Sequence, residues 1–317
     1  RLRAAWDLRQ SLFHHADTNC YRLVNGEGDS LPGIIVDRYA DYLCLKLDTP
    51  AWAPHLPELV RALVSVAAPK GIYLKGLIGE LPKRLAQAPR YDCQPRVLWG
   101  EAPPDPVAVR EYGMALTASL QRGQKTGLFL DQRENRALVR SLSHGRSVLN
   151  LFSYNGGFSI AAAKGGATRV ISVDTAAAAL ADARAIFAAN GFDPEDHGFE
   201  AQSVFTFLAE CSQRFDLVVC DPPSFVSRRT GLERGLAAYT KLHRAAIRAV
   251  RPQGLLAAAS CSSQVDMQAF VGTLREAASR EQKTLRVLER RGTPADHPTP
   301  LRFPEGRYLK LVLAVVD

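Results

Sequence analysis

The chain has 317 residues, of which 40 are basic and 32 acidic, so its formal net charge is +8. Hydrophobic residues make up 46% and charged residues 23%, which is ordinary for a folded globular protein and excludes intrinsic disorder. No apolar run approaches the ~18 residues that a membrane-spanning helix needs. The first ten residues are too polar for a signal peptide.

Six cysteines are scattered along the chain. They are Cys20, Cys44, Cys93, Cys211, Cys220 and Cys261. None belongs to a Cys-x-x-Cys pair, and no cluster with histidine has the spacing of zinc ligands, so we expect no metal site. Scattered thiols in a chain of this size are typical of the reducing cytosol, which predicts a cytoplasmic protein.

The excess of positive charge lies in the second part of the chain. Residues 1–112 carry 14 basic and 13 acidic side chains, whereas residues 113–317 carry 26 and 19. A basic surplus permits a phosphate-rich partner such as RNA, but it also fits an ordinary solvated surface.

The first part of the chain predicts a small α+β domain, because helical apolar spacing alternates with short strand-like runs and turn signals. The expected elements are a helix over 2–13, a turn-rich stretch over 25–33, strands over 34–36 and 42–47, a helix over 52–67 and a strand over 71–75. The proline-rich stretch 101–106 predicts a linker. We therefore expect the first domain to span residues 1–111.

Residues 112–317 predict a second domain of the α/β class, in which strands alternate with helices. The expected strands are 145–152, 169–174, 215–221 and 255–260, with helices over 158–164, 176–190 and 236–250 and a turn at 252–254. This pattern is typical of a doubly wound, mostly parallel Rossmann-like sheet, whose ligand lies beyond the carboxyl ends of the strands. Asn150, Asp174, Asp221 and Cys261 all fall at such ends, and we expect them to lie close together.

The turn from Asn150 to Gly157 suits a nucleotide-like cofactor. It offers a close backbone approach and a helix N-terminus, and Asp174 ends the next strand, where a carboxylate can bind ribose hydroxyls. The turn lacks the Gly-x-Gly-x-x-Gly pattern that accommodates a pyrophosphate. This favours S-adenosylmethionine over a dinucleotide, with a purely structural α/β turn as the other interpretation.

The segment Asp221-Pro-Pro-Ser-Phe225 follows an apolar strand, and its prolines predict a rigid, extended loop that presents Asp221 and Phe225 to a flat ring. Cys261 ends the next strand and is a candidate nucleophile. C5 of a pyrimidine accepts a methyl group only after a thiolate adds to C6, and Asp221 would act as general acid at the ring edge. Purely structural interpretations also remain: the Asp221–Phe225 segment as a stiff connector, and Cys261 as a small buried residue. Cys220 is expected to face the core.

Together these segments resemble class I S-adenosylmethionine-dependent methyltransferases that act on cytosine C5 in bacterial 23S ribosomal RNA. The resemblance covers nearly the whole chain. It depends on residues 21–29 (YRLVNGEGD), 31–33 (LPG), 37–39 (DRY), 125–133 (KTGLFLDQR), 150–158 (NLFSYNGGF), 173–174 (VD), 221–225 (DPPSF), 260–262 (SCS), 296–298 (DHP) and 304–310 (PEGRYLK).

The resemblance implies a nucleophilic Cys261, a base-binding Asp221 loop, a ribose-binding Asp174, and a segment Lys125–Arg133 that covers the cofactor. The implied cofactor-binding residues are Lys125, Phe129, Arg133, Asn150, Phe152, Ser153, Tyr154, Gly156, Asp174, Thr175, Ser203, Val204 and Asp221. Ser203 stands where the family usually has an aspartate near the adenine. The family's N-terminal RNA-binding PUA domain is expected to be missing here, because the sequence starts at the helix that would follow it.

The expected partner is 23S ribosomal RNA, with a flipped or single-stranded base as target. The candidate RNA-binding residues are Arg122, Phe225, Arg228, Arg229 and Arg234. Two other functions stay open: methylation of a nitrogen, either guanine N7 or an exocyclic amine, without a covalent adduct, and a non-catalytic role in ribosome assembly. The sequence leaves open the target nucleotide and the oligomeric state, with a homodimer as one candidate.

Overall fold

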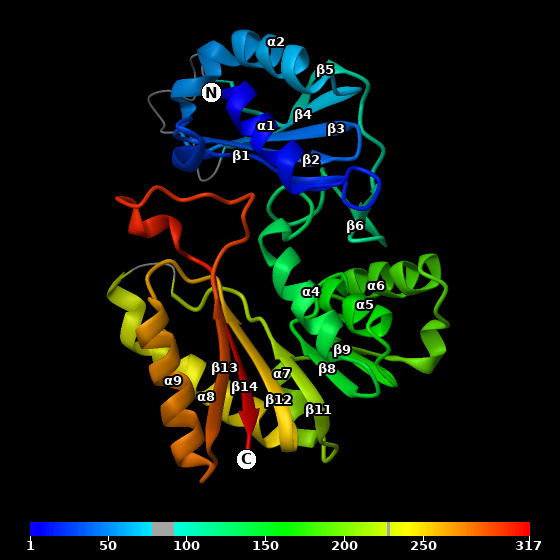
Figure 1. Cartoon of the computed structure of the whole chain (residues 1–317), viewed down its shortest axis with the longest axis vertical. Helices are drawn as coiled ribbons and strands as arrows, with labels where there is room; N and C mark the ends of the chain where they lie inside the picture. Colours follow the sequence, from blue (N-terminus) through cyan, green and yellow to red (C-terminus); the bar gives the residue numbers. More distant parts are fainter. Residues whose placement is uncertain (78–91, 227–228) are drawn as a thin grey trace. The chain divides into compact units, whose positions relative to one another are not determined.

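A computed structural model describes residues 1–77, 92–226 and 229–317 (Figure 1). They form two compact units: Arg1–Arg133 with Pro294–Phe303, called here the first unit, and Glu134–Thr293 with Pro304–Asp317, called the second unit. The domain boundary that the sequence predicts between residues 111 and 112 stays a prediction. Arg228 lies outside the described residues.

The first unit contains a five-stranded sheet in the order β1-β2-β3-β4-β5. Its strands are β1 Cys20–Asn25, β2 Ile34–Tyr39, β3 Tyr42–Leu47, β4 Gly71–Leu77 and β5 Arg96–Gly100. Only β3 and β4 are parallel, because α2 (Leu56–Ala67) connects them as a crossover. The helix α1 (Leu2–Leu12) contacts α2 and β1. The strands expected over 34–36 and 42–47 are confirmed as β2 and β3, which pair antiparallel as a hairpin.

The strand β1 was not expected, and the reason is its burial. Five of its six residues are buried, so it shows none of the alternation that marks a half-exposed strand. The proline-rich stretch 101–106 connects β5 to β6 (Val107–Glu111), which forms a separate hairpin with β7 (Met114–Ala118).

The second unit contains a seven-stranded sheet in the order β10-β9-β8-β11-β12-β14-β13, as expected for a doubly wound fold. Its strands are β8 Ser147–Leu151, β9 Arg169–Asp174, β10 Gly198–Ala201, β11 Phe215–Cys220, β12 Val250–Ser260, β13 Leu285–Arg291 and β14 Lys310–Val316. The first five strands in this order are parallel, and β14 pairs antiparallel with both β12 and β13.

The helices of the second unit fall into two groups (Figure 1). In the described residues the six helices are α4 Arg133–Leu142, α5 Gly157–Lys164, α6 Ala177–Ala189, α7 Val204–Glu210, α8 Leu232–Ala249 and α9 Met267–Arg280. The helix α5 contacts α6, whereas α8 contacts both α7 and α9. The strand order changes direction between β8 and β11. Since crossover connections are right-handed, this change places α5 and α6 on one face of the sheet, and α7, α8 and α9 on the other. The core between β11, β12 and α8 includes Val218, Ala258 and Tyr239, all fully buried.

The turn expected at residues 252–254 is a bulge inside β12 rather than a break before a strand. Phe215 pairs with Val250 and Leu217 with Leu255, so four residues of β12 fall opposite one residue of β11. Gln253 has a positive φ of 62°, so the backbone does turn at the residues where the sequence predicts a turn. Among the described residues, no helix is long and apolar enough to cross a membrane.

Candidate active site

The strand order of the second unit changes direction between β8 and β11, and such switch points carry the ligand crevice in open α/β sheets. Leu151 at the end of β8 pairs with Cys220 at the end of β11, and Cys220 also pairs with Ala258 of β12. Asp221 therefore leaves β11 beside the start of the turn after β8. Cys261 follows β12 on the other side of β11.

The turn after β8 has an unusual backbone. Phe152, Tyr154 and Gly156 have φ values of 59°, 48° and 77°, so left-handed residues alternate with ordinary ones. For bulky side chains this conformation costs on the order of 1–2 kcal/mol each and persists only where neighbours enforce it. One such constraint is the bond from the Ser153 amide to the Val173 carbonyl, at 3.0 Å.

Two glycines let the turn pack closely. A Cβ on Gly156 would lie 2.8 Å from the Cβ of Ala183 on α6, and one on Gly157 would lie 3.2 Å from Cδ of the buried Arg136 on α4. The side chain of Arg136 was not among the predicted site residues. Its contact with Gly157 sets it beside the N-terminus of α5.

Asp174 is directly bonded to the turn. Its carboxylate accepts hydrogen bonds from the amides of Tyr154 and Ala176, each at 2.9 Å. Asp174 is half-buried, and Thr175 beside it is exposed. The structure thus brings together the predicted ribose acceptor and the turn that is predicted to bind the cofactor.

Asn150 lies beneath the turn, inside the unit. Its amide donates to Ser159 of α5 at 2.9 Å, and the Ser159 hydroxyl is 2.7 Å from that of Ser172 on β9. The side-chain oxygens Oδ1 of Asn150 and Oγ of Ser153 are buried and have no hydrogen-bond partner among the described residues. These two acceptors are the unsatisfied polar groups of the turn.

Ser203 and Val204 follow β10 at the same edge of the sheet. Ser203 is the N-cap residue of α7, but its hydroxyl makes no capping bond, and Val204 is buried. The hydroxyl of Ser203, the residue at which this chain differs from the usual family sequence, therefore makes no hydrogen bond that caps the helix.

The loop after β11 packs its far end against α8. A Cβ on Gly235 of α8 would lie 2.1 Å from Cγ2 of Val226 and 3.0 Å from the carbonyl oxygen of Phe225. The rings of Phe225 and Tyr239 are 4.8 Å apart. A glycine inside a helix is unfavourable by itself, so this close approach explains its presence.

The residues on both sides of Cys261 are fixed by hydroxyl groups. The buried Tyr239 hydroxyl lies 2.9 Å from the hydroxyls of both Ser260 and Ser262. Ser262 also lies 2.9 Å from Ser224 of the Asp221 loop. Cys261 itself is only partly buried, whereas Cys220 is fully buried. Burial raises the pKa of the Cys220 thiol far above the usual range.

A lysine that the sequence did not single out as a site residue lies next to this turn. Lys310 begins β14 and pairs with Ser260, and its ammonium donates to the carbonyls of Ser262, Val265 and Tyr308. Its sequence signal was a lysine at the start of the apolar run 311–316.

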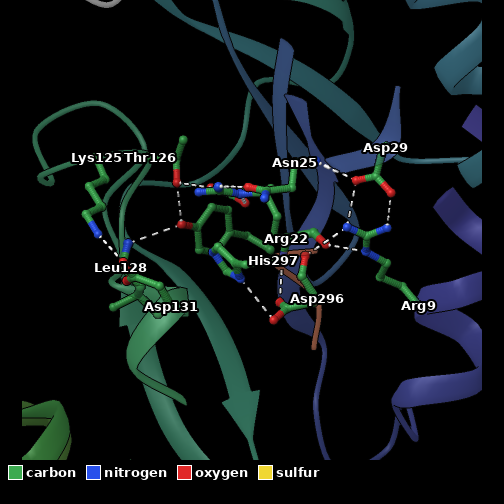
Figure 2. Close-up of polar contacts among 12 residues, drawn as sticks. Arg9, Arg22, Asn25, Asp29, Lys125, Thr126, Leu128, Asp131, Asp296 and His297 are labelled. Atoms are coloured by element: carbon green, nitrogen blue, oxygen red, sulfur yellow. Dashed lines mark hydrogen bonds and ion pairs between the residues drawn. The ribbon is translucent and has the colours of Figure 1, made fainter. Parts of the chain in front are cut away.

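The predicted cofactor-covering segment Lys125–Arg133 lies in the first unit (Figure 2). Lys125 bonds Asp131 at 2.6 Å, and its ammonium is 4.6 Å from the centre of the Phe129 ring. Thr126 lies 2.8 Å from the hydroxyl of Tyr39, which also accepts a bond from the Leu128 amide. The segment is thus attached to β2.

A buried charge network around Asp296 holds the end of this segment, and Figure 2 shows the contact of Asp296 with His297. Asp296 accepts from the guanidinium of Arg133 at 2.6 Å, from the Arg22 amide at 2.9 Å, and contacts Nδ1 of His297 at 3.0 Å. Burial alone would raise the pKa of Asp296, but His297 and Arg133 hold it well below its usual range. Arg133 is fully buried, so it supports the segment from inside the unit.

The candidate RNA-binding side chains differ in their surroundings. Arg229 and Arg234 are exposed in the second unit, and Phe225 is half-buried. Arg122 is exposed in the first unit and lies 3.3 Å from Asp105. No group of three or more potential metal-ligating side chains was found in the described parts of the chain.

Comparison with known proteins agrees with this geometry. Residues 78–304 match the family model of S-adenosylmethionine-dependent methyltransferases. A ribosomal RNA large subunit methyltransferase of Deinococcus radiodurans is 40% identical, over 100% of this chain and 78% of the relative. Ribosomal RNA large subunit methyltransferase I of Erwinia tasmaniensis is 36% identical, over 98% of this chain and 78% of its own length.

A solved methyltransferase structure in complex with S-adenosylhomocysteine superimposes with a TM-score of 0.85. It is 27% identical, and the match covers 98% of this chain and 79% of that chain. The chain therefore belongs to the S-adenosylmethionine-dependent methyltransferases, within the family of ribosomal RNA large subunit methyltransferases.

Proposed function

We propose that this protein methylates C5 of a cytosine in 23S ribosomal RNA, with Cys261 as covalent nucleophile. One observation carries the proposal: Asp221 and Cys261 follow neighbouring parallel strands at the edge that also carries the glycine turn. Relatives named for large-subunit ribosomal RNA support the substrate class, and action in the cytoplasm follows from that substrate.

The turn after β8 has the groups that S-adenosylmethionine requires. The unsatisfied oxygens of Asn150 and Ser153 are acceptors for an ammonium group. Asp174 uses two acceptor positions on backbone amides, and a carboxylate has about four, so the remainder are available to ribose hydroxyls. Ser203 and Val204 are proposed to border the adenine, and contacts from Lys125, Phe129 and Arg133 of the first unit stay predictions.

In the reaction the Cys261 thiolate adds to C6 of the cytosine, and the protonated carboxyl group of Asp221 donates a hydrogen bond or its proton at the ring edge. This addition makes C5 nucleophilic. When bound, S-adenosylmethionine would supply an activated methyl group for the new C5–CH3 bond, and its sulfur would keep the electron pair of the broken S–CH3 bond as S-adenosylhomocysteine. C5 then loses its proton to water, the C6–S bond breaks, and a proton taken up at the ring edge returns to Asp221, so that the thiolate, the acid and the aromatic ring are restored.

The covalent mechanism is tested with wild type, Cys261→Ala and the matched control Cys211→Ala, which removes a partly buried cysteine elsewhere in the second unit. With transcribed 23S RNA, we expect 5-methylcytidine by nucleoside mass spectrometry from wild type and the control only. RNA containing 5-fluorocytidine should form a denaturant-resistant adduct, because fluorine cannot leave as the C5 proton does. Full methylation by Cys261→Ala would refute the covalent mechanism.

Other products would assign another function. An N-methylated nucleoside would mean that the Asp221 loop binds an amine or ring nitrogen without a covalent step. Cofactor binding measured by calorimetry, with no methylated RNA, would favour a non-catalytic role. In the same titration Asp174→Asn should weaken binding roughly 10- to 100-fold, because a bond to a charged acceptor is lost. Exposed Asp182→Asn on α6 serves as its control.

A further inference from the structure

The turn that carries Cys261 is bound by a buried ammonium group. Lys310 is 2% exposed, and its Nζ donates to the carbonyl oxygens of Ser262 at 2.6 Å, Val265 at 2.6 Å and Tyr308 at 2.7 Å. Two of these carbonyls belong to the turn between β12 and α9, directly after Cys261. The pairing of Lys310 with Ser260 fixes the lysine on the strand beside the cysteine.

The three bonds determine what Lys310 can do. An ammonium has three N–H donors, and here each one is used on a carbonyl oxygen. None is left to deliver a proton to a substrate. Lys310 can therefore act as a fixed positive charge and as a brace for the turn, but not as a general acid.

The charge of Lys310 is coupled to Cys261. The pKa of Lys310 is lowered to about 8, because the lowering by burial outweighs the rise caused by a negative charge on Cys261 and, more weakly, on Asp266. The interaction is reciprocal, so a positive Lys310 must favour the thiolate of Cys261 by the same free energy. The titratable groups around the turn come from three elements: Tyr239 on α8, Asp266 at the start of α9 and Lys310 on β14. Asp221 follows β11, the parallel strand beside β12.

We propose that Lys310 is the electrostatic positioning residue of the nucleophile: its ammonium stabilises the Cys261 thiolate and holds the turn that presents it. The inference rests on the proposed function for the role of Cys261 as nucleophile. It adds the source of that nucleophile's reactivity. Nearby cations are a general means of activating cysteines, because the thiolate is the reactive form.

The test measures thiol reactivity without RNA or cofactor. The wild-type chain and the variants Lys310→Met and Tyr239→Phe are alkylated with iodoacetamide from pH 5 to 10. The Cys261 peptide is quantified by mass spectrometry, with Cys211 as internal reference. Lys310→Met should raise the midpoint of Cys261 alkylation by about one pH unit and slow it about tenfold at pH 7. Tyr239→Phe loosens the same turn without removing a charge, so its midpoint should match wild type.

A second measurement applies even where Lys310→Met does not fold. The 13Cε resonance of Lys310 is titrated in wild type and Cys261→Ser, which keeps the size of the side chain but removes the thiolate. Lys310 should titrate at lower pH in Cys261→Ser. An unshifted lysine titration, or an unshifted alkylation midpoint in a folded Lys310→Met, would overturn the proposal. Both readouts are independent of methylation, so a failure to detect 5-methylcytidine would contradict the proposed function alone.

Discussion

The hydroxyl oxygen of Ser224 lies 2.9 Å from that of Ser262, which joins the loop after β11 to the turn after β12. Ser262 is in turn bonded to Tyr239 of α8, and its carbonyl accepts from Lys310 of β14. The loop that carries Asp221 and the turn that carries Cys261 are therefore parts of one hydrogen-bonded structure. A change at any of these positions should therefore alter the placement of both candidate catalytic groups.

Tyr239→Phe should destabilise the second unit and slow methylation. The variant removes a buried hydroxyl that lies between Ser260 and Ser262, at a cost of about 1 kcal/mol, which corresponds to a fall in melting temperature of about 2–4 °C. We expect kcat to fall more than KM rises, because the turn loses order rather than substrate contacts. Tyr73→Phe on β4 of the first unit is the control, and an equal effect there would contradict the assignment.

Gly235→Ala should impair activity by displacing the end of the Asp221 loop. The new methyl group would lie 2.1 Å from Val226 and 3.0 Å from the Phe225 carbonyl, so the loop has to move. The control is Gly272→Ala on α9, where a Cβ meets nothing within 4 Å and the gain in helix propensity is about 1 kcal/mol. Steady-state kinetics and thermal melting compare the two, and comparable activity in both variants would argue against the loop's role.

Gly156→Ala should weaken binding of S-adenosylmethionine. Gly156 has a φ of 77°, and an added Cβ would lie 2.8 Å from Ala183 of α6, so the turn would be both strained and displaced. Gly191→Ala shares the strain, with a φ of 83°, but its Cβ would meet nothing within 4 Å. Calorimetry should show a weaker Kd for Gly156→Ala only, and a matching loss in Gly191→Ala would attribute the effect to general destabilisation.

His243 should make the second unit less stable below neutral pH. Burial lowers the pKa of His243 to about 3, from 6.5 in the unfolded chain. The unfolded state therefore binds a proton that the folded state does not, and stability falls as pH decreases from about 6.5 toward 3. Between pH 7.5 and 5.5 this costs about 1.4 kcal/mol.

Thermal melting of wild type and His243→Leu at these two pH values measures this contribution of His243. The melting temperature of wild type should fall more than that of His243→Leu. The same change at the exposed His144 should leave the wild-type pH dependence intact. Parallel pH curves for wild type and His243→Leu would show that His243 carries no such linkage.

Local patterns were sufficient for the parallel half of the second sheet. The strands that end near Asn150, Asp174 and Asp221 are apolar runs followed by turn residues, and parallel strands bring their carboxyl ends to one edge whatever the details of packing. The same patterns could not show that the side chain of Asn150 faces α5, whereas Ser153 lies in the turn above it. That difference depends on which face each residue takes once the helices are packed.

What the sequence determined by itself is therefore the class of fold, the family and the edge of the sheet where the chemistry lies. Only the tertiary structure decided the surroundings of Cys261, because Tyr239 and Lys310 reach it from a helix and a strand that are distant in sequence. It also decided that Asp296 bonds Arg133, 163 residues away. Buried charges and hydroxyls carry no local periodicity, so their partners are selected by long-range strand pairing and by the need to satisfy each polar group once water is excluded.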